Sequence, residues 1–260
     1  MFSQIRYEVT GRSAVITMAN REKRNALSKA MIDEILAALG EARKAEVRTV
    51  ILRAEKGSKV WSAGHDVSEL PETRRDPLGW SDPLRVVIRA IEEFPAPVFA
   101  LIEGGVWGGA CEMALACDMV FATPEATFAV TPAKLGVPYN VTGLLTFMNT
   151  MSLHVVREMV FTARPIGAER AVQLGIINHV IAADEIEAHC ATLAAEIETL
   201  APLAIAVMKE EMRLLASAHS ITPRMFEKVQ GLRREVYDSA DYREGVAAFK
   251  EKRRPAFTGK

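Results

Sequence analysis

The sequence predicts an α/β protein in which a core of parallel strands and helices is followed by a helical C-terminal part. In the first half, apolar runs of strand length alternate with helical patterns, which favours parallel pairing through right-handed crossovers. From residue 142 onward strand signals nearly vanish, apart from residues 178–181. Because the 260-residue chain has no repeat and no linker rich in Pro, Gly and Ser, we expect a core over residues 1–195 and a helical subdomain over residues 196–260 packed on it.

The N-terminal elements follow from local patterns. Residues 6–9 and 14–18 alternate between apolar and polar side chains, which predicts the two strands of a hairpin. Ser28 suits the N-cap of an amphipathic helix, since apolar side chains recur at helical spacing from Met31. Residues 49–53 form the next expected strand.

Residues 60–70 are expected to contain a turn, and residues 71–83 a surface loop. The first of these segments opens with a short apolar pair, turns at Gly64 and becomes polar. Residues 71–83, rich in Arg, Asp and Pro, are typical of surface loops that cover a site. Helical spacing returns from Leu84 to Phe94.

The most informative stretch begins at residue 98. Residues 98–102 are apolar and precede a pair of glycines, which predicts a buried strand that ends in a turn. Residues 110–117 predict a helix directly after Gly108 and Gly109. These glycines let the backbone turn sharply and leave the first N–H groups of the helix unpaired. Such donors, at the positive end of the helix dipole, can hold a negative oxygen.

Two other interpretations of the glycines compete with this one. A tight turn without function is the plainer alternative, and this stretch alone leaves it open. A nucleotide-phosphate loop is excluded by spacing, because the pattern Gly-Gly-x-x-Gly-Gly over residues 104–109 matches neither the dinucleotide fingerprint nor a P-loop.

The second half is expected to consist mainly of helices. Helical patterns cover residues 153–162, 168–174, 183–200, 203–216, 223–237 and 240–252. Helices attached to a small α/β core in this way can offer apolar faces to sister subunits.

The composition of the chain argues against nucleic acid and membrane as binding partners. The net charge of −1 gives no electrostatic footprint for nucleic acid, and the basic residues 250–254 are typical of a solvated tail. No apolar segment approaches the roughly 20 residues of a membrane span, and the first residues lack the plan of a signal peptide. We therefore expect a cytoplasmic protein that binds neither membrane nor nucleic acid. Cys111, Cys117 and Cys190 lack metal-ligand spacing and are interpreted as reduced, small apolar side chains.

Four motifs occur in a specific order. They are Arg24-Asn-Ala-Leu-Ser28, Ser62-Ala-Gly-His-Asp66, Gly104-Gly-Val-Trp-Gly-Gly-Ala-Cys-Glu112 and Leu135-Gly136. With them the chain resembles the crotonase superfamily, the enoyl-CoA hydratase/isomerase fold, over nearly its whole length. Residues 57–66, 106–109, 135–140 and 249–257, with Thr131-Pro132, resemble most closely the branch of that superfamily that decarboxylates methylmalonyl-CoA. The resemblance implies a spiral of ββα turns and C-terminal helices that assemble a homotrimer or a dimer of trimers, a homohexamer.

The resemblance also implies which residues hold an acyl-CoA substrate. The N–H groups of His65 and Gly109 would bind the thioester oxygen, and such donors stabilise an enolate by about 3–4 kcal/mol each. The side chain of His65 can equally be an ordinary polar side chain, and this stays open. The substrate- and CoA-binding residues implied are Lys23, Arg24, Ala63, Gly64, His65, Asp66, Val67, Gly109, Thr131 and Lys252.

One departure from the hydratase pattern favours decarboxylation. Hydratases of the superfamily carry Glu directly after the proline that matches Pro132, where this chain has Ala133. Because a methyl group cannot activate water, hydration would retain only the carboxylate that matches Glu112. In a decarboxylation the substrate's own carboxylate leaves as CO2, so the site mainly has to orient it.

Hydroxyl groups could fix the departing carboxylate. Tyr139, in the loop after Pro138, and Thr131 offer them. Glu112 could protonate the enolate if burial raises its pKa, or merely order the site, and both roles stay open. The expected catalytic residues are therefore His65, Gly109, Tyr139, Glu112 and Thr131, with no metal and no cofactor apart from the coenzyme A of the substrate.

Three other functions remain as alternatives. Within the superfamily, an enoyl-CoA isomerase or hydratase could act through Glu112 alone. A non-catalytic acyl-CoA-binding protein would bind the same ligand without converting it. An RNA-binding relative is disfavoured by the near-neutral charge.

Overall fold

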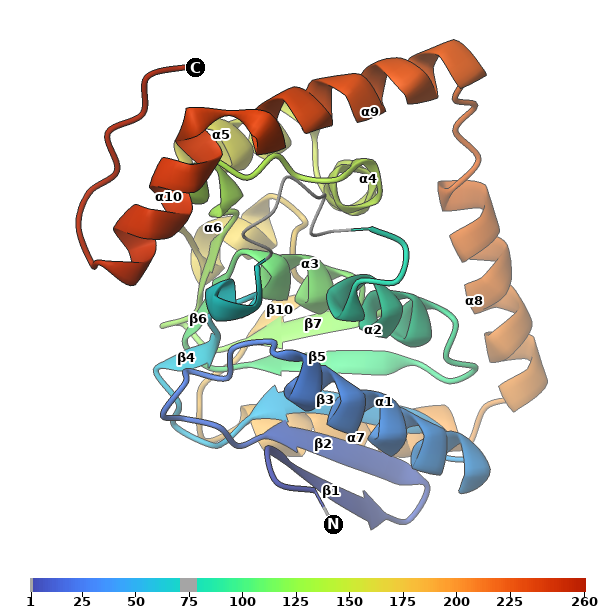
Figure 1. Ribbon diagram of the computed structural model, residues 1–260. Coiled ribbons are helices and arrows are strands. Elements are labelled where there is room, and N and C mark those ends of the chain that lie inside the picture. Colours follow the sequence, from blue (N-terminus) through green and yellow to red (C-terminus); the bar gives the residue numbers. More distant parts are fainter. Residues whose placement is uncertain (1, 71–78) are drawn as a thin grey trace.

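The computed structural model describes residues 2–70 and 79–260, and within these residues the strands form two sheets (Figure 1). The first sheet has the order β1-β2-β3-β5-β7-β10, with β1 (Ile5–Thr10), β2 (Ser13–Met18), β3 (Thr49–Ala54), β5 (Val98–Ile102), β7 (Met119–Ala122) and β10 (His179–Val180). The second has the order β4-β6-β8-β9, with β4 (Val60–Ser62), β6 (Gly105–Trp107), β8 (Thr127–Ala129) and β9 (Ile166–Gly167).

Helices cover both sheets and continue to the C-terminus. They are α1 (Lys29–Lys44), α2 (Pro83–Glu92), α3 (Gly109–Leu115), α4 (Val141–Thr150), α5 (Leu153–Thr162), α6 (Ala168–Gln173), α7 (Ile186–Glu198), α8 (Pro202–Ala216), α9 (Pro223–Asp238) and α10 (Ala240–Lys250). Two short 3₁₀ helices, η1 (Val67–Glu69) and η2 (Pro132–Leu135), lie in loops.

The same unit of two strands and a helix recurs along the core. In β3-β4-α2, β5-β6-α3 and β7-β8-α4, the first strand joins the large sheet and the second strand joins the small one. Strands β2, β3, β5 and β7 pair in parallel, whereas β1 and β2 form the predicted antiparallel hairpin. The predicted α/β core and its spiral of ββα turns are therefore confirmed.

Some elements differ from the sequence prediction. Strands β6 and β8 are only three residues long, too short for an alternating pattern, and both were missed. Helix α4 was also missed, because it is apolar around most of its circumference; Asn140 caps it by accepting from Gly143 N at 2.6 Å. Helix α10 ends at Lys250 rather than residue 252. The predicted loop at residues 71–83 lies outside the described residues over positions 71–78.

The C-terminal helices α8 and α9 extend beside the core with most of their residues exposed, whereas α10 packs against η2 (Figure 1). Lys209 of α8 is buried, and its Nζ pairs with Asp118 at 2.6 Å and donates to the carbonyls of Ile91 and Ala96. Other faces of α8 leave apolar side chains in solvent, including Leu203 and Leu215. Among the described residues no single helix is long and apolar enough to cross a membrane; α7 and α8 reach such a length only together, with a bend of 109° between them.

Candidate active site

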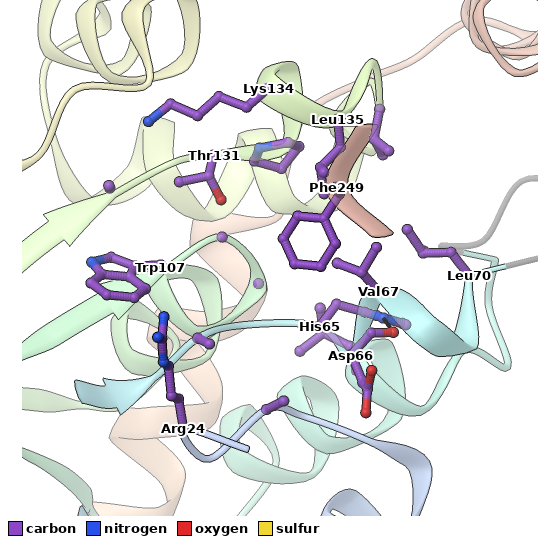
Figure 2. A pocket seen from close by; sticks show the side chains of 18 of the residues that line it. Arg24, His65, Asp66, Val67, Leu70, Trp107, Thr131, Lys134, Leu135 and Phe249 are labelled. Carbon is purple, nitrogen blue, oxygen red and sulfur yellow. Dashed lines mark hydrogen bonds between the residues drawn. The ribbon is translucent and has the colours of Figure 1, made fainter. Parts of the chain in front are cut away.

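A cavity of about 1010 Å³ lies between the small sheet, the N-terminal ends of α2 and α3, and α10 (Figure 2). Its wall contains most of the residues selected from the sequence: Lys23, Arg24, Ala63, His65, Asp66, Val67, Gly109, Glu112, Thr131 and Tyr139. Two of the predicted residues, Gly64 and Lys252, are not on the wall. Lys252 is exposed just beyond α10 and does not line the cavity of this single chain, so its predicted contact with the CoA, within the chain or from a neighbouring subunit, stays a prediction.

The backbone amides of His65 and Gly109 lie close together on this wall. A Cβ atom on Gly109 would lie 3.6 Å from His65 N. Gly64 makes this approach possible, because its φ is +87° and a Cβ there would lie 2.3 Å from the carbonyl oxygen of Trp107. Leu27 N donates to Gly64 O at 2.8 Å and holds the segment in place. Within the described residues neither amide donates a hydrogen bond, so both are available to an oxygen atom in the cavity.

Glu112 is buried on the cavity wall and paired with a cation. Its Oε1 accepts from Nη1 of Arg85 on α2, while its Oε2 is buried and has no hydrogen-bond partner within the described residues. Burial raises the pKa of Glu112 to about 7, although the charge of Arg85 opposes the rise. At neutral pH the carboxyl group is therefore poised between its two protonation states.

Tyr139 contributes a hydroxyl group to the same part of the wall. The hydroxyl donates to Gly108 O at 3.4 Å, and the ring packs edge-on against Phe147 with centroids 5.1 Å apart. Burial and the neighbouring Glu112 carboxylate raise the pKa of Tyr139 well above its usual value, which keeps the hydroxyl protonated and able to donate. Thr131 also lies on the wall. Within the described residues its hydroxyl group has no hydrogen-bond partner.

The side chain of His65 turns toward the start of α2. Its Nε2 lies 3.4 Å from Asp82 Oδ2, and its Nδ1 lies 3.1 Å from Asp66 O. Burial alone would lower the pKa of His65, but the hydrogen bond and charge of Asp82 outweigh it and raise the pKa overall. The imidazole therefore has a structural partner, whereas the backbone N–H of the same residue donates no hydrogen bond within the described residues.

Glu112 is the only buried carboxylate among those that line the described part of the wall. Among its described carboxylates, Glu22 is exposed, and Asp66 accepts from Ser68 and pairs with Lys23 at 3.8 Å. Ala133, the position of the missing second carboxylate, is exposed and does not line the cavity.

The mouth of the cavity combines basic and apolar groups. Lys23, Arg24 and Lys134 line it together with the ring of Phe249, which projects from α10 into the pocket (Figure 2). Basic groups in such a position can meet the phosphates of a nucleotide-bearing ligand, and the apolar groups can meet its uncharged parts.

Sequence reasoning missed Arg85, Asp82 and Phe249. Two signals could have found the first two. Arg85 precedes Ile88 by three positions and so shares a buried helix face, where a lone arginine indicates a buried partner. Asp82 directly precedes Pro83, an arrangement typical of a helix start, and it accepts from Leu84 N. Phe249 begins the segment 249–257 that carries part of the resemblance, but its residue type did not indicate a place in the site.

Three ββα turns and a pair of adjacent, unpaired amides on one cavity wall define a crotonase-type α/β protein. Comparison with known proteins agrees with this class. The chain belongs to the enoyl-CoA hydratase/isomerase family, whose sequence pattern matches residues 9–260.

Individual relatives are similar over nearly the whole chain. Methylmalonyl-CoA decarboxylase of Escherichia coli K12 is 50% identical over 246 residues, which cover 95% of this chain and 94% of the relative. A probable enoyl-CoA hydratase of Rhodobacter capsulatus is 32% identical, with 100% and 99% covered. A solved structure of methylmalonyl-CoA decarboxylase in complex with 2-nitronate-propionyl-CoA superposes with a TM-score of 0.98 at 47% identity, over 100% of both chains.

Proposed function

We propose that this protein is a carboxy-lyase that decarboxylates methylmalonyl-CoA to propionyl-CoA, or malonyl-CoA to acetyl-CoA, with release of CO2. The 50% identity to a methylmalonyl-CoA decarboxylase supports the reaction and the substrate class. The near-identical fold of a decarboxylase that binds a propionyl-CoA analogue supports the same cavity as the substrate site.

The observation that carries the proposal is the pair of free amides beside a hydroxyl group. In the proposed reaction the bond between C2 and the carboxylate carbon breaks, and its electron pair forms the C1–C2 double bond of an enolate. The thioester oxygen takes the negative charge and is bound by the N–H groups of His65 and Gly109. Two donors that meet charge as it develops stabilise the enolate more than the ground state, and CoA is part of the substrate rather than a separate cofactor.

The hydroxyl groups of Tyr139 and Thr131 would orient the substrate. The C2–carboxylate bond has to stand perpendicular to the thioester plane for its electrons to enter the carbonyl system. A hydroxyl that stays protonated can hold the carboxylate in that position without transferring a proton to it. Glu112, with a pKa of about 7 and an unpaired Oε2, would then return one proton to C2 after CO2 has left.

Lys23, Arg24 and Lys134 would bind the phosphates of CoA at the cavity mouth. Lys252 would reach them only from a neighbouring subunit. We propose a homotrimer or a dimer of trimers, supported by the unpartnered apolar side chains of α8, of which Leu203 is 80% exposed. Sedimentation or light scattering would measure the assembly directly.

Incubation of the purified protein with three thioesters tests the proposed reaction. Methylmalonyl-CoA and malonyl-CoA should give propionyl-CoA and acetyl-CoA with an equal amount of CO2, whereas crotonyl-CoA should be unchanged by mass spectrometry. Turnover of crotonyl-CoA without loss of CO2 from the other two would instead establish a hydratase or isomerase that acts through Glu112. Binding of all three without turnover would establish an acyl-CoA-binding protein.

Replacement of Tyr139 by Phe tests the orienting hydroxyl. The phenyl ring keeps the contact with Phe147, so the fold should persist. Loss of one hydrogen bond to a charged group is worth about 1.5–3 kcal/mol, so kcat/KM should fall roughly 10- to 100-fold while CoA binding changes little. Wild-type activity in this variant would remove Tyr139 from the mechanism.

A further inference from the structure

Arg233 of α9 binds the backbone of the loop that carries Tyr139. Its Nη1 donates to the carbonyl oxygens of Pro138 at 3.1 Å and Tyr139 at 2.5 Å, and its Nη2 donates to the Tyr237 hydroxyl at 3.1 Å. The arginine is only 6% exposed, although most side chains of α9 face solvent. A buried guanidinium requires acceptors, and two of those it has here belong to the peptide units around Tyr139.

The same loop is held from a second side by α10. A Cβ atom on Gly245 would lie 2.2 Å from Leu135 O, and one on Gly136 would lie 2.8 Å from Asp241 O, so helix and loop are in backbone contact. Val137 also packs with Tyr237 and Tyr242 in a small apolar cluster. The loop therefore lies between the C-terminal helices and the cavity.

We propose that Arg233 is a positioning residue for Tyr139. It fixes the carbonyl groups on both sides of the Tyr139 Cα atom, and with them the place of the side-chain hydroxyl in the cavity. This role rests on the proposed function, in which Tyr139 holds the departing carboxylate. It would also make the C-terminal helices part of the catalytic apparatus, although Arg233 itself does not line the cavity.

Loss of Arg233 should displace Tyr139 because of the carbonyl groups that the arginine binds. Without Arg233, the carbonyls of Pro138 and Tyr139 would lose a charged donor, and the loop would shift toward water or another donor. A displacement of about 1 Å in a group that orients substrate can reduce the rate roughly 100-fold. Binding of CoA should change little, because the proposed phosphate contacts come from other segments.

Two neighbouring arginines allow a matched comparison. Arg233→Met removes the donors but keeps an unbranched apolar chain, whereas Arg234→Met alters a side chain that is 82% exposed. We expect kcat to fall about 10- to 100-fold in the first variant, with the dissociation constant of a nonreactive CoA thioester within about twofold of wild type. The Arg234 variant should behave like wild type. Arg233→Lys, which keeps a charged donor, should recover part of the rate.

A double variant separates positioning from a general loss of structure. If Arg233 acts through the Tyr139 hydroxyl, Arg233→Met should cause little further loss in a Tyr139→Phe background. Equal fold-losses in both backgrounds, or a wild-type rate in Arg233→Met, would overturn the proposal. Amide hydrogen exchange over residues 135–140 gives a readout without substrate: it should be faster in Arg233→Met than in Arg234→Met, and unchanged exchange would also overturn it. If the wild-type protein does not decarboxylate, the proposed function is wrong. The exchange measurement would still show whether Arg233 stabilises the loop at residues 135–140.

Discussion

Arg85 and Glu112 form a buried ion pair beside the two free amides of the cavity. Their side chains are 7% and 1% exposed, and they come from α2 and α3 of two successive ββα turns. The pair occupies only Oε1 of Glu112, and the buried Oε2 has no hydrogen-bond partner within the described residues. Burial raises and Arg85 lowers the pKa of Glu112, and the balance of about 7 makes this group the expected source of pH dependence.

The first prediction concerns the pH dependence of the wild type and of Glu112→Gln. With a pKa of about 7, Glu112 is protonated below that pH and ionised above it. Only the protonated form can give a proton to C2, and the ionised form repels the substrate carboxylate, so kcat should fall as pH rises through about 7. Glu112→Gln should be slower and should lose this step in its pH–rate profile. If kcat of Glu112→Gln still fell near pH 7, a group other than Glu112 would be responsible for the pH dependence.

The second prediction concerns Arg85→Met. The cation lowers the pKa of Glu112, so its removal leaves burial unopposed by this charge and the pKa should rise above about 7. The high-pH fall in kcat should therefore move to higher pH, which a pH–rate profile would measure. Arg85→Lys keeps the charge and should leave the profile closer to wild type. A shift to lower pH in the Met variant would contradict the assigned role of the pair.

These side chains show where sequence information ends. The helices and the hairpin could be predicted because each depends on a local period, as with the apolar face that begins at Met31 and the Ser28 cap. The two glycine turns were also visible in the sequence. The approach of His65 to Gly109, however, depends on Gly64 meeting the carbonyl of Trp107, a contact between segments more than forty positions apart.

Partners of the buried charges could not be predicted for the same reason. Arg85 meets Glu112 across 27 positions, and Arg233 meets the Tyr139 carbonyl across 94 positions. Neither pair produces a periodic pattern in the sequence, because its two residues are far apart along the chain and meet only in the folded structure. The expected contact of Lys252 with the CoA, which can come from a neighbouring subunit, stays a prediction, because a single chain does not test it.

The third prediction concerns Gly109→Ala. A methyl group there would lie 3.6 Å from His65 N and 2.6 Å from Leu84 Cδ2, so it would crowd the space between the two donors. Alanine keeps the N–H of residue 109, but its methyl group would hold the thioester oxygen away from the donors. Losing the contact with one such donor typically reduces kcat by about 10²- to 10³-fold, and we expect a loss of this size in steady-state assays with the fold retained. If the cause were only the clash with Leu84, the double variant with Leu84→Ala would recover activity. We expect it to stay slow.

The fourth prediction concerns Asp82→Asn and the stability of the protein. Burial lowers the pKa of His65, but the hydrogen bond and charge of Asp82 raise it above the unfolded value of about 6.5. A raised pKa contributes stability that is fully present below the unfolded pKa and is lost as pH rises through the folded one. In Asp82→Asn the amide oxygen can still cap α2, where Asp82 accepts from Leu84 N, but the charge is gone.

The measurement is the free energy of unfolding in urea between about pH 5.5 and 8.5, made in a Glu112→Gln background because Glu112 titrates in the same range. With Asp82 present, the contribution of His65 should fall as pH rises across this window. In the Asp82→Asn variant, burial becomes the dominant effect on the imidazole, its pKa should drop below the unfolded value, and the contribution should weaken toward low pH instead. Parallel stability curves for the two proteins would show that the contact between His65 and Asp82 has no influence on protonation of the imidazole.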